Sequence, residues 1–278
     1  MLDLVTVVFE KEVSMLALQA SSIARFGSDI GRIVIINNAC NDAGIELLRH
    51  RIQDEVVPCY GALADRVMLY DVKQLLGRTY GVQGWESQQI LKLNSGRLCT
   101  PGSIAMLLDA KNYFAKQFDL DTFTDGSKLK MRIGGVEDWS REQYENSCRV
   151  WGLSSDQIRE CAAGFPGIRT PWLIHSDVLI SCADSYAELQ GAFDTDPVTQ
   201  FEFYIMGAFI HREFDGIQNY FMHTAETVAY HTHRSEWAAL SELHRAELLR
   251  YMIDHNLFDE DGALDCIRRI QQDINSHP

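Results

Sequence analysis

The sequence has no long hydrophobic run and few prolines. Its longest apolar stretches, such as Arg32–Asn37, fall far short of the roughly 20 residues that a membrane-spanning helix needs, and they read as buried strands. The first residues, Met1–Leu4, lack the basic flank and apolar run of a signal peptide, so we expect a cytoplasmic protein. Six prolines in 278 residues and no clear linker predict one domain, with parts at 1–115, 116–235 and 236–278.

Common cysteine and glycine motifs are also missing. The seven cysteines are scattered without a C-x-x-C pair, which favours reduced thiols over disulfides or a zinc knuckle. No G-x-G-x-x-G follows the first apolar run, so a nicotinamide-binding Rossmann domain is not expected. The sequence has neither a Walker A motif nor a G-x-S-x-G elbow, which argues against a P-loop enzyme and a serine hydrolase of that type.

Positive charge is in deficit. There are 25 Lys and Arg residues against 39 Asp and Glu, giving a formal charge of −14. This balance argues against nucleic acid as a partner and against tight binding to an anionic membrane surface. Hydrophobic residues make up 46% and charged residues 23%, which are ordinary values for a globular protein.

The N-terminal third alternates between apolar runs and helical periodicity. The runs at 4–9, 32–37 and 66–70 predict buried strands, and the stretches at 13–25 and 44–52 predict helices between them. This β-α-β-α-β order predicts a mostly parallel sheet flanked by helices. Ligands bind beyond the carboxyl ends of such strands. The residues expected at these ends are Phe9, Glu10, Asn37, Asn38 and Asp71.

Further along, a helix is predicted at 83–94 and an apolar strand from Ser103 that ends in Asp109-Ala-Lys-Asn112. The polar segment 119–167, with several turns, reads as an insertion, and residues 169–175 re-enter the core. Residues 200–209 are aromatic and apolar around one carboxylate, Glu202, and helical periodicity returns from 236.

The segment Trp85–Asn112 resembles a group of bacterial glycosyltransferase-like proteins with the GT-A fold. Their pattern, Trp-x-x-Gln-Gln-x-x-Lys-Leu followed by a strand ending Leu-Asp-x-Asp or Leu-Asp-Ala-Lys-Asn, is matched by the residues Trp85, Gln88, Gln89, Lys92, Leu93, Leu108, Asp109, Ala110, Lys111 and Asn112. The resemblance implies an activated-sugar donor across the strand ends, bound by residues 1–115. It also implies that a glycan acceptor meets residues 116–235.

The resemblance places Asp109 where metal-dependent GT-A enzymes have a D-x-D motif. Here Lys111 replaces the second acid, and one carboxylate is a poor Mg²⁺ or Mn²⁺ site unless other oxygens converge on it. We therefore expect Lys92 and Lys111 to meet the donor diphosphate, while Asp109 binds a sugar hydroxyl or orients a lysine. The alternative is that both lysines are surface cations and Asp109 caps a turn. Gln88, Gln89 and Asn112 complete the expected donor site, although the two glutamines suit a helix surface equally well.

A carboxylate in apolar surroundings tends to have a raised pKa, which suits a general base. Glu202 is therefore the first candidate for deprotonating the acceptor hydroxyl, and His175 with Asp177 is the second. The alternative is a helix-surface glutamate whose neighbours face the core. The late histidines His211, His223, His231 and His233 leave room for a metal site, although such histidines are more often structural or exposed.

The resemblance implies a glycosyltransferase that uses a nucleotide sugar, or alternatively phosphoribosyl diphosphate, in surface polysaccharide synthesis. No resident cofactor is expected, apart from Mg²⁺ or Mn²⁺ if Asp109 has other oxygen partners, and no oligomeric state is indicated. Two other hypotheses remain open: a GT-A-like domain that binds without catalysis, and a histidine-based metallohydrolase.

Overall fold

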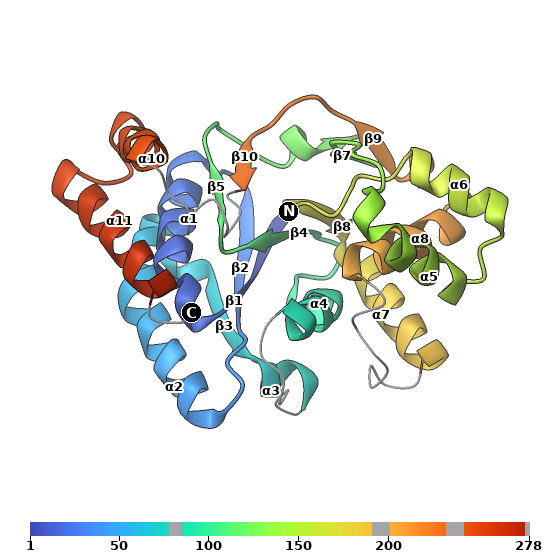
Figure 1. The fold of residues 1–278 in the computed structure, drawn as a ribbon, viewed down its shortest axis with the longest axis horizontal. Helices are drawn as coiled ribbons and strands as arrows, with labels where there is room; N and C mark the ends of the chain where they lie inside the picture. Colours follow the sequence, from blue (N-terminus) through green and yellow to red (C-terminus); the bar gives the residue numbers. More distant parts are fainter. Residues whose placement is uncertain (78–84, 191–200, 232–241, 276–278) are drawn as a thin grey trace.

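A computed structural model describes residues 1–77, 85–190, 201–231 and 242–275, and it has the predicted α/β architecture (Figure 1). The central sheet has the strand order β3-β2-β1-β4-β8. Its strands are β1 (Leu2–Val8), β2 (Ile30–Asn37), β3 (Val67–Asp71), β4 (Ile104–Asp109) and β8 (Trp172–His175). Strands β1 to β4 pair in parallel, as the sequence predicts, whereas β8 runs antiparallel to β4.

The sheet lies between two groups of helices (Figure 1). The bounds of the described α-helices are α1 (Val13–Phe26), α2 (Asp42–Arg51), α3 (Val72–Leu76), α4 (Trp85–Asn94), α5 (Arg141–Val150), α6 (Ser155–Ala163), α7 (Ser176–Gln190), α8 (Glu202–Glu213), α10 (Glu242–Asp254) and α11 (Glu260–Asn275). Helices α1, α2, α10 and α11 gather at the left of Figure 1, and α5 to α8 gather at the right. The helices predicted at 13–25 and 83–94 correspond to α1 and α4, and the predicted helical C-terminus corresponds to α10 and α11.

Short helical turns and two small sheets complete the fold. The turns are η1 (Glu10–Glu12), η2 (Ile52–Val56), η3 (Val57–Arg66), η4 (Ser95–Leu98), η5 (Asp121–Phe123), η6 (Asp138–Ser140) and η8 (Ile217–Asn219). One sheet joins β6 (Thr124–Asp125), β7 (Lys128–Met131) and β9 (Phe221–His223); the other pairs β5 (Asn112–Phe114) with β10 (Ala229–His231). Strands β8 and β10, from the predicted second half, therefore pair with β4 and β5 of the first.

Helix α1 lies between two hydrophobic clusters. Leu16, Ala20 and Ile23 belong to the main core, which surrounds the central sheet. Met15 and Leu18 belong to a second cluster formed with α10 and α11. An almost entirely buried helix of this kind follows from its sequence, because apolar residues occupy more than one face.

A buried carboxylate holds the amino edge of the sheet. Asp3 is fully buried in β1, and its oxygens accept hydrogen bonds from Arg32 N at 2.7 Å, Thr100 N at 2.6 Å and Ser103 Oγ at 2.9 Å. These donors satisfy the charge locally, so the residue joins β1 to β2 and to the segment before β4.

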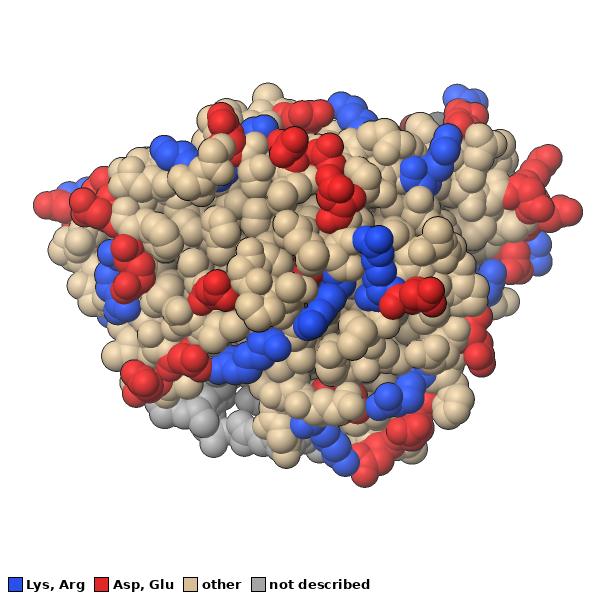
Figure 2. All heavy atoms as spheres, turned by 180° about the vertical axis from the view of Figure 1, so that it is seen from behind, with Lys and Arg blue, Asp and Glu red and all other residues tan. Residues whose placement is uncertain are grey.

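The described helices include none that is both long and apolar enough to cross a membrane. Acidic and basic side chains are interspersed on the face seen from behind (Figure 2).

Candidate active site

A cavity of about 320 Å³ lies at the carboxyl end of β4. It is lined by Gln88, Gln89, Lys92, Asp109, Lys111, Glu137, Trp139, Ile168, Arg169, Thr170, Phe201, Glu202 and Phe203. The residues of this lining that the sequence singles out are Gln88, Gln89, Lys92, Asp109, Lys111 and Glu202. They come from α4, the end of β4 and the start of α8, so three segments far apart in the chain meet here.

The centre of the site is a buried lysine between two carboxylates. Lys92 Nζ lies 2.6 Å from Asp109 Oδ1 and 3.5 Å from Glu202 Oε1. The side chains of Lys92 and Glu202 are only 3% and 8% exposed, and that of Asp109 is 18% exposed. Lys92 is therefore not a surface cation, because its charge is already engaged by two carboxylates inside the protein.

This arrangement shifts the pKa values of both buried groups. Burial raises the pKa of Glu202, and the nearby Lys92 opposes that shift. Burial alone would lower the pKa of Lys92, but Asp109 and Glu202 outweigh it and leave that pKa above its ordinary value. The lysine accordingly stays protonated at neutral pH.

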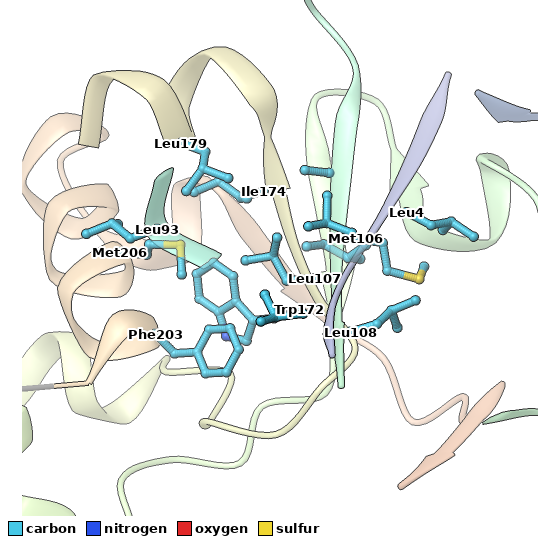
Figure 3. Close-up of a cluster of buried hydrophobic side chains, with 14 of the residues drawn as sticks. Leu4, Leu93, Met106, Leu107, Leu108, Trp172, Ile174, Leu179, Phe203 and Met206 are labelled. Atoms are coloured by element: carbon cyan, nitrogen blue, oxygen red, sulfur yellow. The ribbon is translucent and has the colours of Figure 1, made fainter. Parts of the chain in front are cut away.

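Core packing fixes the three groups, because each has an apolar neighbour in the chain that is buried. Leu93, Leu108 and Phe203 follow or precede Lys92, Asp109 and Glu202, and all three lie in the main core (Figure 3). Phe203 stacks on Trp172 of β8, with ring centroids 5.3 Å apart. The segments that carry the charged side chains are therefore held by core packing, as a preorganised site requires.

A polar network holds the turn that follows Asp109. Asn112 Oδ1 accepts a hydrogen bond from Asp109 N at 2.8 Å, and Asn112 Nδ2 donates to Thr170 O at 3.2 Å. Gln19 Nε2, from α1, donates to Asp109 O at 2.7 Å and to Asn112 O at 3.2 Å. Sequence reasoning missed Gln19; the available signal was a single amide within the apolar helix 13–26. Asn112 is fully enclosed in this network and lies outside the lining of the cavity.

Lys111 projects from the same turn and has a different environment from Lys92. Its Nζ lies 3.9 Å from Glu12 Oε1, and its side chain is 20% exposed. Burial raises the pKa of Glu12, and Lys111 partly offsets that rise. Lys111 lines the cavity and is held by one loose ion pair, so it is better placed than Lys92 to meet an anionic ligand.

The two predicted glutamines contact the central charges. Gln88 Nε2 donates to Asp109 Oδ1 at 2.8 Å. Gln89 Oε1 accepts from Glu202 N at 3.3 Å, at the start of α8. Both residues therefore orient the carboxylate-bearing segments, in addition to lining the cavity.

The residues predicted at the ends of β1 to β3 do lie there, but outside the described lining of the cavity. Asp71 caps α3 by accepting from Gln74 N, and its Oδ2 pairs with Arg49 at 2.8 Å. Asn37 donates to Ile45 O at 2.8 Å and accepts from Ala39 N at 3.0 Å. Phe9, Glu10 and Asn38 complete the set; Phe9 and Asn38 are buried, and the carbonyl of Glu10 accepts from Arg51.

His175 lies beside the amino end of β4, whereas Asp109 lies at its carboxyl end. Strand β8 is antiparallel, so its last residue, His175, is paired with Ile104 at the start of β4. Its ring Nδ1 is 2.8 Å from Tyr220 Oη, and burial lowers its pKa. The length of β4 separates His175 from the cavity, which leaves Glu202 as the candidate base beside Asp109.

The outer rim of the cavity consists of residues that the sequence analysis did not identify: Glu137, Trp139 and Arg169. Trp139 is 64% exposed, and its Nε1 donates to Glu137 Oε2 at 2.5 Å. Arg169 lies 3.6 Å from Glu137 Oε1. Nothing in their local sequence has a period or motif, so only the folded chain brings them to the cavity.

The side chains around Asp109 are poor ligands for a divalent metal. Asp109 Oδ1 already accepts from Lys92 and Gln88, and position 111 contributes a cation. Within the described parts of the chain, no three His, Cys, Asp or Glu side chains are grouped so as to hold a metal. Of the late histidines, His211 is buried on α8 and His223 Nδ1 accepts from Ile133 N, while His233 and the side chain of His231 lie outside the described residues.

No protein-family model matches the chain, and no curated protein matches it. Among solved structures, it aligns with the galactosyltransferase LgtC in complex with donor and acceptor sugar analogs, at 12% identity and a TM-score of 0.48, over 96% of this chain and 95% of that one. It also aligns with mouse xyloside xylosyltransferase 1, at 11% identity and a TM-score of 0.43, over 84% and 97% of the two chains. A third is residues 1–349 of S. aureus TarS, at 10% identity and a TM-score of 0.41, over 99% and 72%.

Proposed function

We propose that this protein is a glycosyltransferase that moves a sugar from a diphosphate-activated donor to a hydroxyl group of a glycan. The observation that carries the proposal is the buried group of Lys92, Asp109 and Glu202 beside a cavity at the carboxyl end of a parallel strand. Sugar transfer needs a base for the acceptor hydroxyl and fixed positive charge near the leaving phosphate. The cavity offers chemical groups suited to both tasks.

In this proposal each charged residue has a distinct role. Glu202 takes the proton of the acceptor hydroxyl, a role that suits a buried carboxylate with a raised pKa. Lys111, partly exposed, meets the donor diphosphate. Asp109 binds a sugar hydroxyl, and Lys92 holds both carboxylates in place instead of contacting phosphate.

We further propose that the donor binds without a divalent metal. Lys92 lies against Asp109, and a metal on Asp109 would have to compete with that ammonium group at 2.6 Å. Lys111, which lines the cavity, would supply positive charge to the diphosphate without needing several converging oxygens. The resemblance of the Trp85–Asn112 segment to bacterial enzymes suggests a surface polysaccharide as the glycan, and the donor is a nucleotide sugar or phosphoribosyl diphosphate.

Thermal unfolding of the purified protein against donor analogues tests this proposal. The panel contains UDP, GDP, CDP, CMP, dTDP and phosphoribosyl diphosphate, each with Mg²⁺, Mn²⁺ or EDTA. A ligand at a hundred times its dissociation constant should stabilise the protein by about 2.7 kcal/mol. We expect a shift for one donor class that persists in EDTA and weakens in Lys111→Met. A shift that requires metal would overturn metal independence, and no shift with any compound would overturn the donor site.

A non-catalytic binding domain is the second candidate, favoured by one observation: Asp109 is already paired within the protein. Turnover of the donor identified by the panel separates the two candidates. An enzyme should lose turnover by at least about a hundredfold in Asp109→Asn, because an interaction of a charged group in the transition state is removed. A binder has no turnover in the wild type, and its ligand-induced stabilisation is its only signal.

A further inference from the structure

Trp139 at the rim of the cavity presents a large exposed aromatic surface. Its side chain is 64% exposed, although it lies in η6 next to the buried Ser140. A single exposed aromatic residue needs no explanation in itself. Three further observations distinguish this one: its position on the cavity, its fixed orientation and the charges around it.

The orientation of the ring is set by contacts on two sides. The indole Nε1 donates to Glu137 Oε2 at 2.5 Å. The ring also lies at 60° to Phe201, with centroids 5.8 Å apart, and Phe201 is only 4% exposed. Trp139 therefore contacts the protein on one side and exposes the rest of its ring to solvent. Because these contacts already fix the side chain, a ligand could stack on it without first ordering it.

The rim is close to the proposed reacting groups. Phe201, on which Trp139 leans, directly precedes Glu202 in the chain. Arg169 and Thr170 line the same cavity, and Thr170 O accepts from Asn112, in the turn that begins at Asp109. A ring stacked on Trp139 would thus lie beside the cavity that Glu202 also lines.

The lining of the cavity contains as many cations as carboxylates. The cations are Lys92, Lys111 and Arg169, and the carboxylates are Asp109, Glu137 and Glu202. At the rim itself, Arg169 and Glu137 are 3.6 Å apart and offset each other. At the rim, the paired Arg169 and Glu137 beside an aromatic face suit an uncharged ring with many hydroxyl groups better than an anion, because hydroxyl groups both donate and accept.

We propose that Glu137, Trp139 and Arg169 form an acceptor subsite for an uncharged pyranose ring, which stacks on Trp139. This inference rests on the proposed transferase function, because it assigns the second substrate to the same cavity. Glu137 and Arg169 bind hydroxyl groups at the edge of the ring. Glu202 then meets the hydroxyl that points into the cavity.

Saturation-transfer difference NMR tests the subsite with a defined set of probes. The probes are the methyl glycosides of glucose, galactose and N-acetylglucosamine, and the methyl glycosides of glucuronic and galacturonic acid. We expect at least one uncharged glycoside to bind the wild type, and its affinity to fall about tenfold, or 1.4 kcal/mol, in Trp139→Ala. Trp139→Phe, which keeps an aromatic face, should retain most of the affinity.

Phe214→Ala is the matched control, because Phe214 is also exposed and aromatic but lies outside the lining of the cavity. It should leave glycoside binding unchanged. Failure of every probe to bind the wild type, binding of the uronic acids only, or unchanged affinity in Trp139→Ala would each overturn the inference.

The donor panel keeps this result separate from the proposed function. Trp139→Ala should keep the full donor-induced thermal shift of the wild type, and its retained unfolding temperature shows that it folds. A donor shift without glycoside binding would refute the subsite alone. Glycoside binding without any donor shift would refute the transferase proposal and leave a sugar-binding surface.

Discussion

Lys92 provides one positive charge to two carboxylates, of which Glu202 is buried and Asp109 is 18% exposed. Lys92→Met should lower the free energy of unfolding by about 3–5 kcal/mol, because Asp109 and Glu202 would lose their buried partner. Lys111→Met is the comparison and should cost less, because Lys111 has one carboxylate partner, Glu12, at a distance of 3.9 Å. Urea unfolding followed by circular dichroism measures both. Equal losses in the two variants would contradict this account of the site.

Glu202 should control the acid side of the pH–rate profile. Burial raises its pKa above 4.5, against the opposing effect of Lys92, while Asp109 adds to the rise. As a base it works only when deprotonated, so kcat/KM should rise with pH through a pKa above 4.5. Glu202→Gln should abolish this limb, whereas Glu213→Gln, an exposed control on the same helix, should keep it.

The same shift has a consequence for stability. The folded protein holds the Glu202 proton more tightly than the unfolded chain does. The tighter proton binding therefore stabilises the folded protein most below pH 4.5. This stabilisation is lost as the pH rises through the raised pKa of Glu202. Across this window the free energy of unfolding of the wild type should fall with rising pH relative to that of Glu202→Gln, whose amide does not titrate. Urea unfolding of both proteins at several pH values measures this difference.

At the scale of elements, α1 supports the turn between β4 and β5. Gln19→Leu should destabilise the protein by about 1–3 kcal/mol, because the carbonyls of Asp109 and Asn112 and the hydroxyl of Thr6 would lose a buried partner. Ser21→Ala, on the same helix, removes a hydrogen bond to Ala17 O and a contact with the Cys59 thiol, and it should have a smaller effect. Donor affinity should fall in Gln19→Leu alone, since this turn carries Lys111.

Some elements could be predicted from the sequence because their physical cause is local. Strands β1 and β2 are buried on both faces, so they appear as continuous apolar runs, and Asp109 follows the abrupt end of another such run. The direction of β8 has no local cause. It depends on the path of the chain between β5 and β8, so the sequence could not show that His175 lies at the far edge. Trp139 became part of the site for the same reason.

At the scale of the whole molecule, the C-terminal helix is fastened to the start of α1. Asp273 Oδ2 accepts from Ser14 N and Oγ at 3.1 and 2.7 Å, and Oδ1 pairs with Arg51 at 3.1 Å. Asp273→Ala should therefore cost about 1–3 kcal/mol and speed hydrogen exchange throughout α11. Asp265→Ala, on the exposed side of α11, should change stability by less than about 1 kcal/mol. Equal exchange rates in the two variants would show that this contact does not hold the helix.

The carboxylates at the two ends of the parallel strands have different hydrogen-bond partners. Asp3, at the amino ends of the strands, accepts hydrogen bonds from the backbone amides of Arg32 in β2 and Thr100 before β4, and from the Ser103 hydroxyl. Asp109 at the carboxyl edge is held by the side chains of Lys92 and Gln88, which have several rotatable bonds each. Asp3 is thus held mainly by the backbone, whereas Asp109 is held by side chains that can change rotamer. An arriving ligand can exchange partners with Asp109 while the sheet beneath it keeps its shape.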